Sequence, residues 1–204
     1  MDRREAVKYI SLLMGGTVVG GTAFLTGCKS DTAKPQNWDA SEIAYLDEIA
    51  ETILPQTSTP GAKAAKVGEF MKVMVTDCYE ASHQDAFRKG MTQLNETSKE
   101  KYNRVFMELD PKERHALLVE MDAAAKKYQE EIKKHNQEED NKAKADLKYV
   151  KQTKAPHYFT MMKQLTLLGF FTSEVGTKEA RRHTPVPGRF DACIPYKKGD
   201  KSFA

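Results

Sequence analysis

Cysteine is scarce in this sequence, and the few cysteines lie far apart. There are three in 204 residues, at positions 28, 78 and 193. No CxxC pair is present, so the usual thiolate sets for zinc and iron–sulfur clusters are excluded, and no CxxCH segment offers a haem attachment. The glycines form neither a GxGxxG dinucleotide fingerprint nor a Walker-type phosphate loop. The sequence therefore predicts no cofactor bound to this chain.

Metal-binding and catalytic patterns are lacking as well. The five histidines, at positions 83, 115, 135, 157 and 183, show no HExxH spacing. No Glu-x-x-His pair recurs on two predicted helices, as a di-iron bundle would need. We therefore predict no metal ligands and no catalytic residue. The formal net charge is only +3, with Lys and Glu interspersed, which does not favour a nucleic-acid partner.

The first 28 residues have the order of an export signal. Arg3 and Arg4 open a basic head, a moderately apolar run follows from 9 to 24, and small residues lead to Cys28. This order is typical of a signal peptide, and the run is too short and too rich in glycine for a membrane-spanning helix. The arginine pair resembles a twin-arginine signal, and Leu-Thr-Gly-Cys resembles a bacterial lipobox.

These patterns predict where the mature chain resides. Residues 1–27 would be removed, and Cys28 would be lipidated and hold the protein on a bacterial membrane in the periplasm. Residues 28–37 are polar and contain almost no apolar side chains, which is typical of a flexible tether. Residues 38–204 would then form the folded domain.

The domain is predicted to be all-α, because apolar residues recur three and four positions apart and no alternating strand pattern of useful length occurs. Predicted helices cover 39–54, about 62–81, and a third stretch that begins at Ser82 and either continues through Tyr102 and Phe106 or breaks near Asn95. A fourth begins at Asp110-Pro111 with Glu113 at the capping-box position. The nearly all-charged stretch beyond Glu130 is either a protruding helix or a loop.

Apolar density returns between positions 158 and 168, on almost every side of a helix. This predicts a central helix that ends at Gly169, with a last short helix between 173 and 183. After Thr184 the chain is rich in proline and glycine, so regular structure is not expected. The fold class is therefore an irregular multi-helix bundle with an extended Pro/Gly-rich C-terminal arm.

Two segments have features of a protein–protein interface. Phe170 and Phe171 are adjacent aromatics at a helix end, so either a bend buries both or one anchors a partner. The arm carries aromatic and apolar side chains that a free coil has little reason to keep, and it would lie on its own domain or across a neighbour. The predicted partner interface comprises Phe170, Phe171, Glu174, Pro185, Pro187, Phe190 and Tyr196.

Cys78 and Cys193 remain after the predicted lipidation site. In an oxidising compartment they can pair, which would pin the arm to the second predicted helix. The alternative is that Cys78 is a small core residue on an apolar helix face. Both interpretations stay open at the level of the sequence.

Three motifs together resemble the gluconate 2-dehydrogenase subunit 3 family. They are the helix that ends in Thr-Ile-Leu-Pro at 52–55, the Gly-Phe-Phe-Thr-Ser-Glu-Val-Gly segment at 169–176, and Pro-Val-Pro-Gly at 185–188 with Cys-Ile-Pro-Tyr at 193–196. The resemblance implies a small non-catalytic subunit that partners a GMC-type dehydrogenase. That large subunit would hold FAD and oxidise sugars or sugar acids, and a cytochrome c subunit often takes the electrons.

The export signal fits this resemblance. A twin-arginine route carries folded cargo, so a chain without a cofactor gains little from it, whereas a partner that folds around a cofactor gains much. We therefore expect an escort that carries a signal-less partner across the membrane. The alternatives are a stand-alone helical ligand-binding or adaptor lipoprotein, and an enzyme in its own right, which the missing site patterns disfavour.

Overall fold

The computed structural model describes residues 37–203 except 147, 153, 187 and 189–192. The export signal, the lipobox and most of the tether therefore lie outside the described residues. Within them the regular elements are all helical: α2 (Ala40–Ile53), η1 (Ala62–Ala65), α3 (Val67–Val73), η2 (Met74–Cys78), α4 (Ala81–Tyr102), η3 (Phe106–Glu108), α5 (Pro111–Ala145), α6 (Tyr158–Thr172) and η4 (Gly176–Ala180). No strand occurs among these residues, so the predicted all-α class is confirmed.

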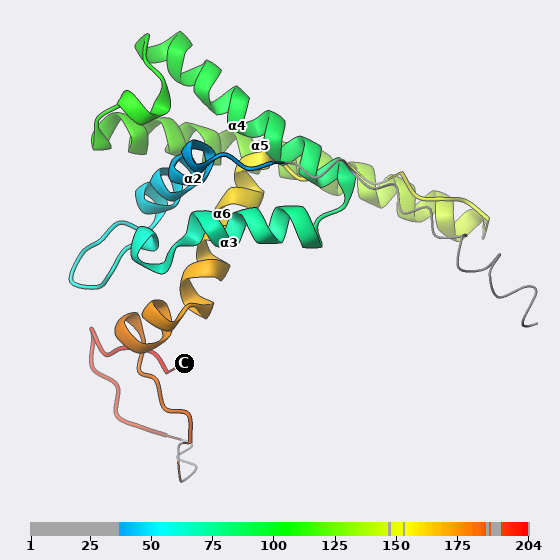
Figure 1. Ribbon diagram of the computed structural model, residues 1–204. Helices are drawn as coiled ribbons and strands as arrows, with labels where there is room; N and C mark the ends of the chain where they lie inside the picture. The colour runs from blue at the N-terminus through cyan, green and yellow to red at the C-terminus, as the bar shows by residue number, and fades with distance from the viewer. Residues whose placement is uncertain (1–36, 147, 153, 187, 189–192, 204) are drawn as a thin grey trace, which may run out of the picture. The chain divides into compact units, whose positions relative to one another are not determined.

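Helix α6 lies at the centre of the domain, as predicted. It packs against α2, α3, α4 and α5 (Figure 1). Eight of its residues are buried, which explains why its apolar side chains point in so many directions. The buried residues of α6 are Tyr158, Phe159, Met161, Met162, Leu165, Thr166, Gly169 and Phe170.

Helices α2 and α5 begin where local capping chemistry predicts. The Asp110 carboxylate accepts hydrogen bonds from the amides of Lys112 and Glu113, and the Glu113 side chain accepts from the Asp110 amide. This reciprocal pair and Pro111 satisfy the first turn of α5. Asp39 and Glu42 form the same arrangement at the start of α2.

The second predicted helix, 62–81, is wrong as a single element. Lys66 has a left-handed backbone conformation with φ of 51°, which ends the 3-10 turn η1 and starts α3 in a new direction. Asp47 of α2 accepts a hydrogen bond from the Gly68 amide at 2.7 Å and so stabilises the new helix start. The far end widens into the π-turn η2 before α4 begins.

Other predicted boundaries also shift. Helix α4 begins at Ala81 rather than at a Ser82 cap, and it runs unbroken past Asn95 to Tyr102. Helix α6 does not end at Gly169 but continues to Thr172. Glycine suits position 169 because the Phe70 ring packs against it, and an added Cβ would approach Phe70 Cδ1 to 2.6 Å.

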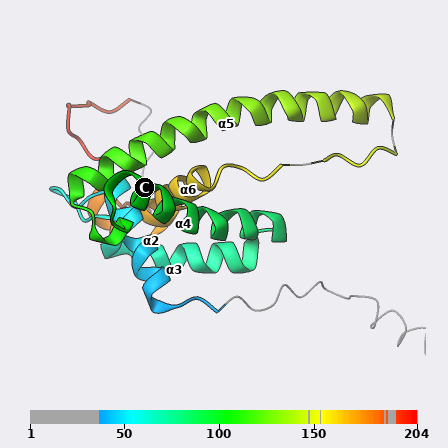
Figure 2. The ribbon, with the colours of Figure 1, turned by 90° about the horizontal axis from the view of Figure 1, so that it is seen from above.

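The charged half of α5 is a helix, which decides between the two sequence alternatives. Figure 2 shows it beside the segment that returns to α6. The Glu139 carboxylate accepts hydrogen bonds from the Gln152 amide at 2.7 Å and the Tyr149 hydroxyl at 2.8 Å, and pairs with Lys142. Lys142, with these two donors, lowers the pKa of Glu139 to about 2. One carboxylate therefore fastens the return segment to the helix.

Gly90 allows α4 to pack closely against α6, and we predict that replacing it destabilises the domain. An added Cβ would collide with the Cβ and Cγ of Tyr158, the rigid root of that side chain. Gly-to-Ala in a helix normally stabilises by about 0.5–1 kcal/mol, whereas overpacking here should destabilise by about 2–3 kcal/mol. Thermal unfolding of Gly90→Ala checks the sign, with Gln93→Ala on the exposed face of α4 as control. A melting temperature equal to or above that of the unaltered chain would contradict the packing argument.

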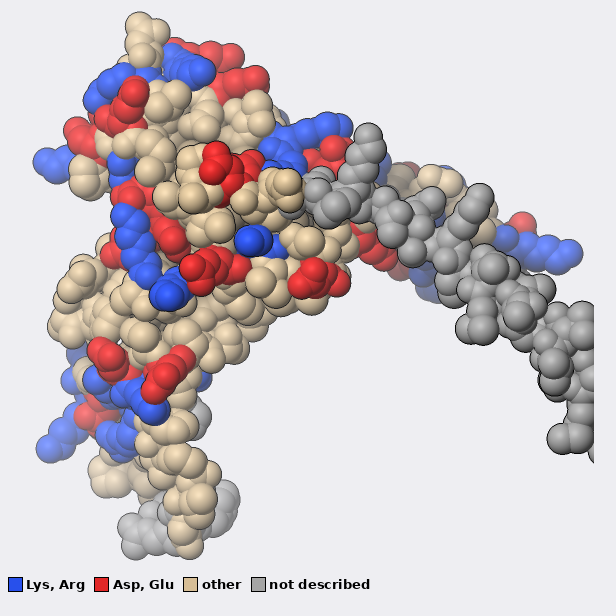
Figure 3. Space-filling view, in the orientation of Figure 1, with Lys and Arg blue, Asp and Glu red and all other residues tan. Residues whose placement is uncertain are grey.

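Among the described residues, no helix is long and apolar enough to cross a membrane. Basic and acidic side chains are interspersed over the face of the domain that Figure 3 shows, so that face presents no broad area of one sign.

Candidate docking face

The C-terminal half of α6 presents an apolar face to solvent. Leu167, Leu168 and Phe171 are 39, 46 and 38% exposed. Residues 167 and 171 are four positions apart and 168 and 171 three, so the three side chains share one side of the helix. We call these three residues the docking face. The sequence predicted a central helix with apolar residues on almost every side, and the structure shows that Leu167 and Leu168 lie on the side that faces solvent.

The two adjacent phenylalanines have different environments. Phe170 is 4% exposed and belongs to the core, whereas Phe171 is partly open to solvent. Their rings meet edge to face with centroids 5.2 Å apart, an arrangement that aromatic pairs favour. The core thus supports the Phe171 ring from below and leaves its outer side available.

The end of α6 is a tightly bonded turn built from the Gly169–Gly176 motif. The Ser173 hydroxyl donates to the Phe170 carbonyl at 2.7 Å and accepts from the Gly176 amide at 3.0 Å. An added Cβ at Gly176 would collide with the Phe170 carbonyl oxygen. Since serine caps the next helical turn and glycine permits its close approach, the motif fixes the direction in which the chain leaves α6.

Two adjacent arginines flank this turn, and sequence reasoning missed both. The Arg181 Nη2 donates to the Phe171 carbonyl and, at 3.4 Å, to Thr177 Oγ1, and its guanidinium lies 5.7 Å from the Phe171 ring centroid. The Arg182 guanidinium lies 4.8 Å from the Phe203 ring centroid. The signal that could have indicated a role was their adjacency, ten positions after Phe171.

The other predicted interface residues have less fixed surroundings. Glu174 is exposed and pairs with Lys178 at 2.6 Å, and this hydrogen bond lowers the pKa of Glu174. Pro185 is exposed, and Tyr196 is 76% exposed. Pro187 and Phe190 lie outside the described residues. The arm's later part returns to the domain, because the Arg182 amide donates to the Ser202 carbonyl at 2.7 Å.

The two remaining cysteines are both exposed and unbonded in the structure. The alternative that Cys78 is a core residue is therefore wrong. A bond between Cys78 and Cys193 stays a prediction, which thiol counting with and without reductant would test.

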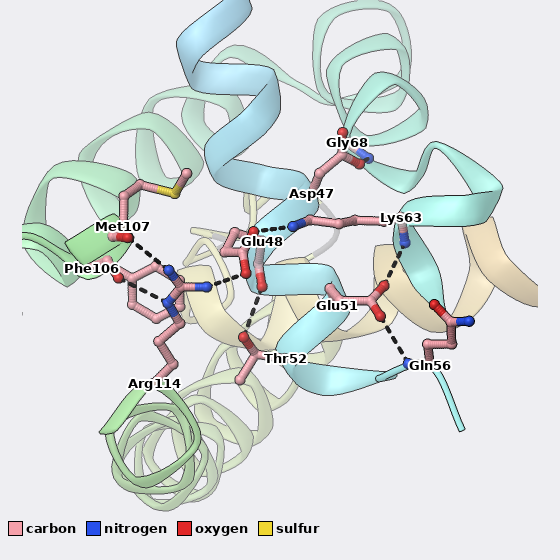
Figure 4. Close-up of polar contacts among 10 residues, drawn as sticks. All are labelled: Asp47, Glu48, Glu51, Thr52, Gln56, Lys63, Gly68, Phe106, Met107 and Arg114. Carbon is pink, nitrogen blue, oxygen red and sulfur yellow. Dashed lines mark hydrogen bonds and ion pairs between the residues drawn. The ribbon is translucent and has the colours of Figure 1, made fainter. Parts of the chain in front are cut away.

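Three acidic side chains of α2 form ion pairs or hydrogen bonds with neighbouring elements. Figure 4 shows the Glu48 carboxylate between Arg114 of α5 and Lys63 of η1, in ion pairs with both. Glu51 accepts a hydrogen bond from the Lys63 amide at 2.8 Å. Asp47 is partly buried, which raises its pKa. These three carboxylates thus join α2 to its neighbours.

His157 also has a structural task. Its Nδ1 accepts a hydrogen bond from the Phe159 amide at 3.2 Å and so caps α6, while the ring stacks on Tyr158 at 4.4 Å. Burial lowers the pKa of His157, which keeps the accepting neutral form. No group of three or more His, Cys, Asp or Glu side chains that could hold a metal ion occurs in the described part of the chain.

One surface groove of about 490 Å³ lies where α2, α4 and η3 meet. Tyr45, Met91 and Met107 contribute to its lining. The Tyr45 hydroxyl donates to the Met91 carbonyl at 3.2 Å, and burial raises the pKa of Tyr45. The charged groups of the lining are Glu42, Glu96 and Lys99.

The described fold defines a class of protein: an all-α multi-helix domain whose central helix presents an apolar face to solvent near its C-terminal end. The chain belongs to the gluconate 2-dehydrogenase subunit 3 family, whose model matches residues 40–188. This range contains the docking face and runs from the first residue of α2 into the arm. No curated protein and no solved structure gives a significant match.

Proposed function

We propose that this chain is the non-catalytic subunit of a dehydrogenase complex, which it escorts through twin-arginine export and anchors to a membrane. Its catalytic partner would be a GMC-type flavoprotein that holds FAD and oxidises a sugar or sugar acid. A cytochrome c subunit would receive the electrons. The observation that carries the proposal is the family match over 40–188, which covers nearly all the described helices.

The geometry supports a docking role for this chain. The docking face is rigidly supported, since Phe170 and Ser173 hold the end of α6 in the core. Side chains of this kind, an aromatic anchor with two leucines around it, are typical of interface centres. The partly buried carboxylates of α2 are occupied by ion pairs and amide donors, so they support the fold.

Export and anchoring rest on the sequence. Arg3 and Arg4 would address the complex to the twin-arginine route, and lipidated Cys28 would hold it at the periplasmic side of a membrane. Because the partner would fold around FAD before crossing, one signal on this chain would serve both polypeptides.

Gentle detergent extraction of the tagged full-length chain, followed by pull-down, tests the proposal. We expect a stoichiometric yellow partner whose flavin spectrum responds to its sugar substrate. The matched control is the same extraction from cells that lack the dehydrogenase gene. A monomer without a flavoprotein would instead favour a stand-alone ligand-binding lipoprotein, for which the 490 Å³ groove is the candidate site. Sugar oxidation by the purified chain alone would contradict the non-catalytic role.

A further inference from the structure

The arginines of this domain divide into two groups. Five lie among the described residues, and three of them form ion pairs with carboxylates of the same domain: Arg88 with Glu42 at 2.5 Å, Arg104 with Glu113 at 2.6 Å, and Arg114 with Glu48. Arg181 and Arg182 pair with no carboxylate of the described residues. The two arginines without acidic partners are adjacent, and both follow the turn that ends α6.

Their present contacts leave most of their hydrogen-bonding capacity unused. Arg181 reaches the Phe171 carbonyl and Thr177, but its Nε is buried without an acceptor. Arg182 covers the Phe203 ring, which is 52% exposed. A guanidinium carries five N–H donors in a planar fork that matches a carboxylate. No described carboxylate neutralises either guanidinium, and the exposed Arg182 is accessible to an anionic acceptor on another molecule.

Within the described part of the segment from 181 to 203, no carboxylate pairs with either arginine. Of the described residues from 181 to 203, Asp200 is the single acidic one, and its carboxylate accepts from the Lys197 amide at 2.9 Å. Lys197 and Lys198 are exposed, so they add to the positive charge of the segment. Among the described residues no carboxylate pairs with either arginine, and the exposed Arg182 can bind an anionic group of another molecule.

We propose that the catalytic subunit presents carboxylates to Arg181 and Arg182 beside an apolar pocket that receives Phe171. This inference rests on the proposed function and names the chemistry of the partner's surface. Arginine and aromatic side chains dominate interface energetics, and a guanidinium over a ring places both anchors at one spot. The arginines thus determine which partner surface is accepted, because an uncharged apolar patch would leave them unpaired.

The choice of a protein surface follows from the rigidity of the site. Arg181 is fixed to the backbone of α6, and the docking face beside it has a defined shape. A preformed arrangement of ring, leucines and guanidinium fits a complementary protein pocket. The phosphates of an anionic bilayer are also negatively charged acceptors for arginine, so binding to lipid vesicles is one arm of the test.

Association kinetics of the detergent-solubilised full-length chain with the purified catalytic subunit test the inference. For Arg181→Gln combined with Arg182→Gln we expect binding weaker by about 30- to 1000-fold, with a smaller dependence of the association rate on salt. The control is Arg104→Gln, which also removes one exposed cation but from the pair with Glu113. It should change the affinity by no more than about twofold.

Arg182→Gln alone keeps the test decisive, since Arg181 also bonds the α6 end and its loss could unfold that turn. We expect about a tenfold loss for this variant with an unchanged melting temperature, and partial recovery with Arg182→Lys, which keeps the charge but not the fork. Unaltered affinity in the double variant and in Arg182→Gln would overturn the inference and leave the proposed function intact. Arginine-dependent binding to phosphatidylglycerol vesicles, with complex formation unaffected, would overturn it in favour of a lipid surface. Failure of the unaltered chain to bind would remove the proposed function itself.

Discussion

Replacing Leu168 and Phe171 with aspartate is expected to abolish the complex with the catalytic subunit while the helical domain stays folded. The two side chains are 46 and 38% exposed in the isolated chain, so the change removes partly buried apolar contacts and should lower the stability of the domain by about 1–3 kcal/mol without unfolding it. In the complex, two carboxylates would have to be desolvated at the centre of an apolar contact, which costs several kcal/mol. We expect binding weaker by about 10³-fold or more.

Titration of the variant with the purified flavoprotein measures this effect, and circular dichroism checks the fold. The control is Val150→Asp, because Val150 is 79% exposed and lies in the segment that returns from α5. It makes the same chemical change away from the docking face. If the double variant binds as tightly as the unaltered chain, the partner contacts another surface.

Changing Arg3 and Arg4 to lysine is expected to leave both this chain and its partner in the cytoplasm. The paired guanidinium groups would be recognised by their planar donor geometry, which an ammonium does not reproduce. Because the partner is proposed to lack a signal of its own, its export should fall together with that of the escort. Dye-linked sugar oxidation at the periplasmic side of the membrane fraction should drop close to zero, with activity retained in the cytoplasm.

Cys28→Ser separates the two functions of the N-terminal segment. This variant keeps the arginine pair but removes the thiol that would be lipidated, so activity should appear in the periplasm without firm membrane attachment. Deleting residues 1–27 should reproduce the export defect. An active partner in the periplasm of cells that carry the lysine variant would rule out the escort role.

The helices whose ends depend on neighbouring residues were predicted well. Asp110, Pro111 and Glu113 lie within four positions of one another, and the structure shows the reciprocal cap that their order implies. Pro55 likewise follows the end of α2 closely. Such signals work because capping satisfies backbone donors with side chains a few residues away.

The break in the second predicted helix could not be derived in the same way. Its apolar stripe is continuous in the sequence, yet Lys66 takes a left-handed conformation and the Asp47 carboxylate receives the Gly68 amide. Asp47 is on another helix, 21 positions earlier. A contact of that range depends on how α2 and α3 pack, which periodicity does not report.

Only part of the docking face followed from the sequence. For the paired phenylalanines the sequence left open whether both rings are buried or one is free, and the apolar residues up to 168 predicted a central helix without showing which of its sides faces solvent. The sequence does not distinguish the arginines at 181 and 182 from other surface residues. The contrast appears only in the structure, where the other described arginines form ion pairs with carboxylates.

The sequence by itself determined the helical class, the capped starts of α2 and α5, the family resemblance and the predicted export address. These features depend on residues close together in the chain. Tertiary structure alone decided which sides of α6 face solvent, where the second helix divides, and which of the described arginines form ion pairs. The reason is that burial and ion pairing depend on which elements pack around a side chain, and in this domain those elements come from distant parts of the chain.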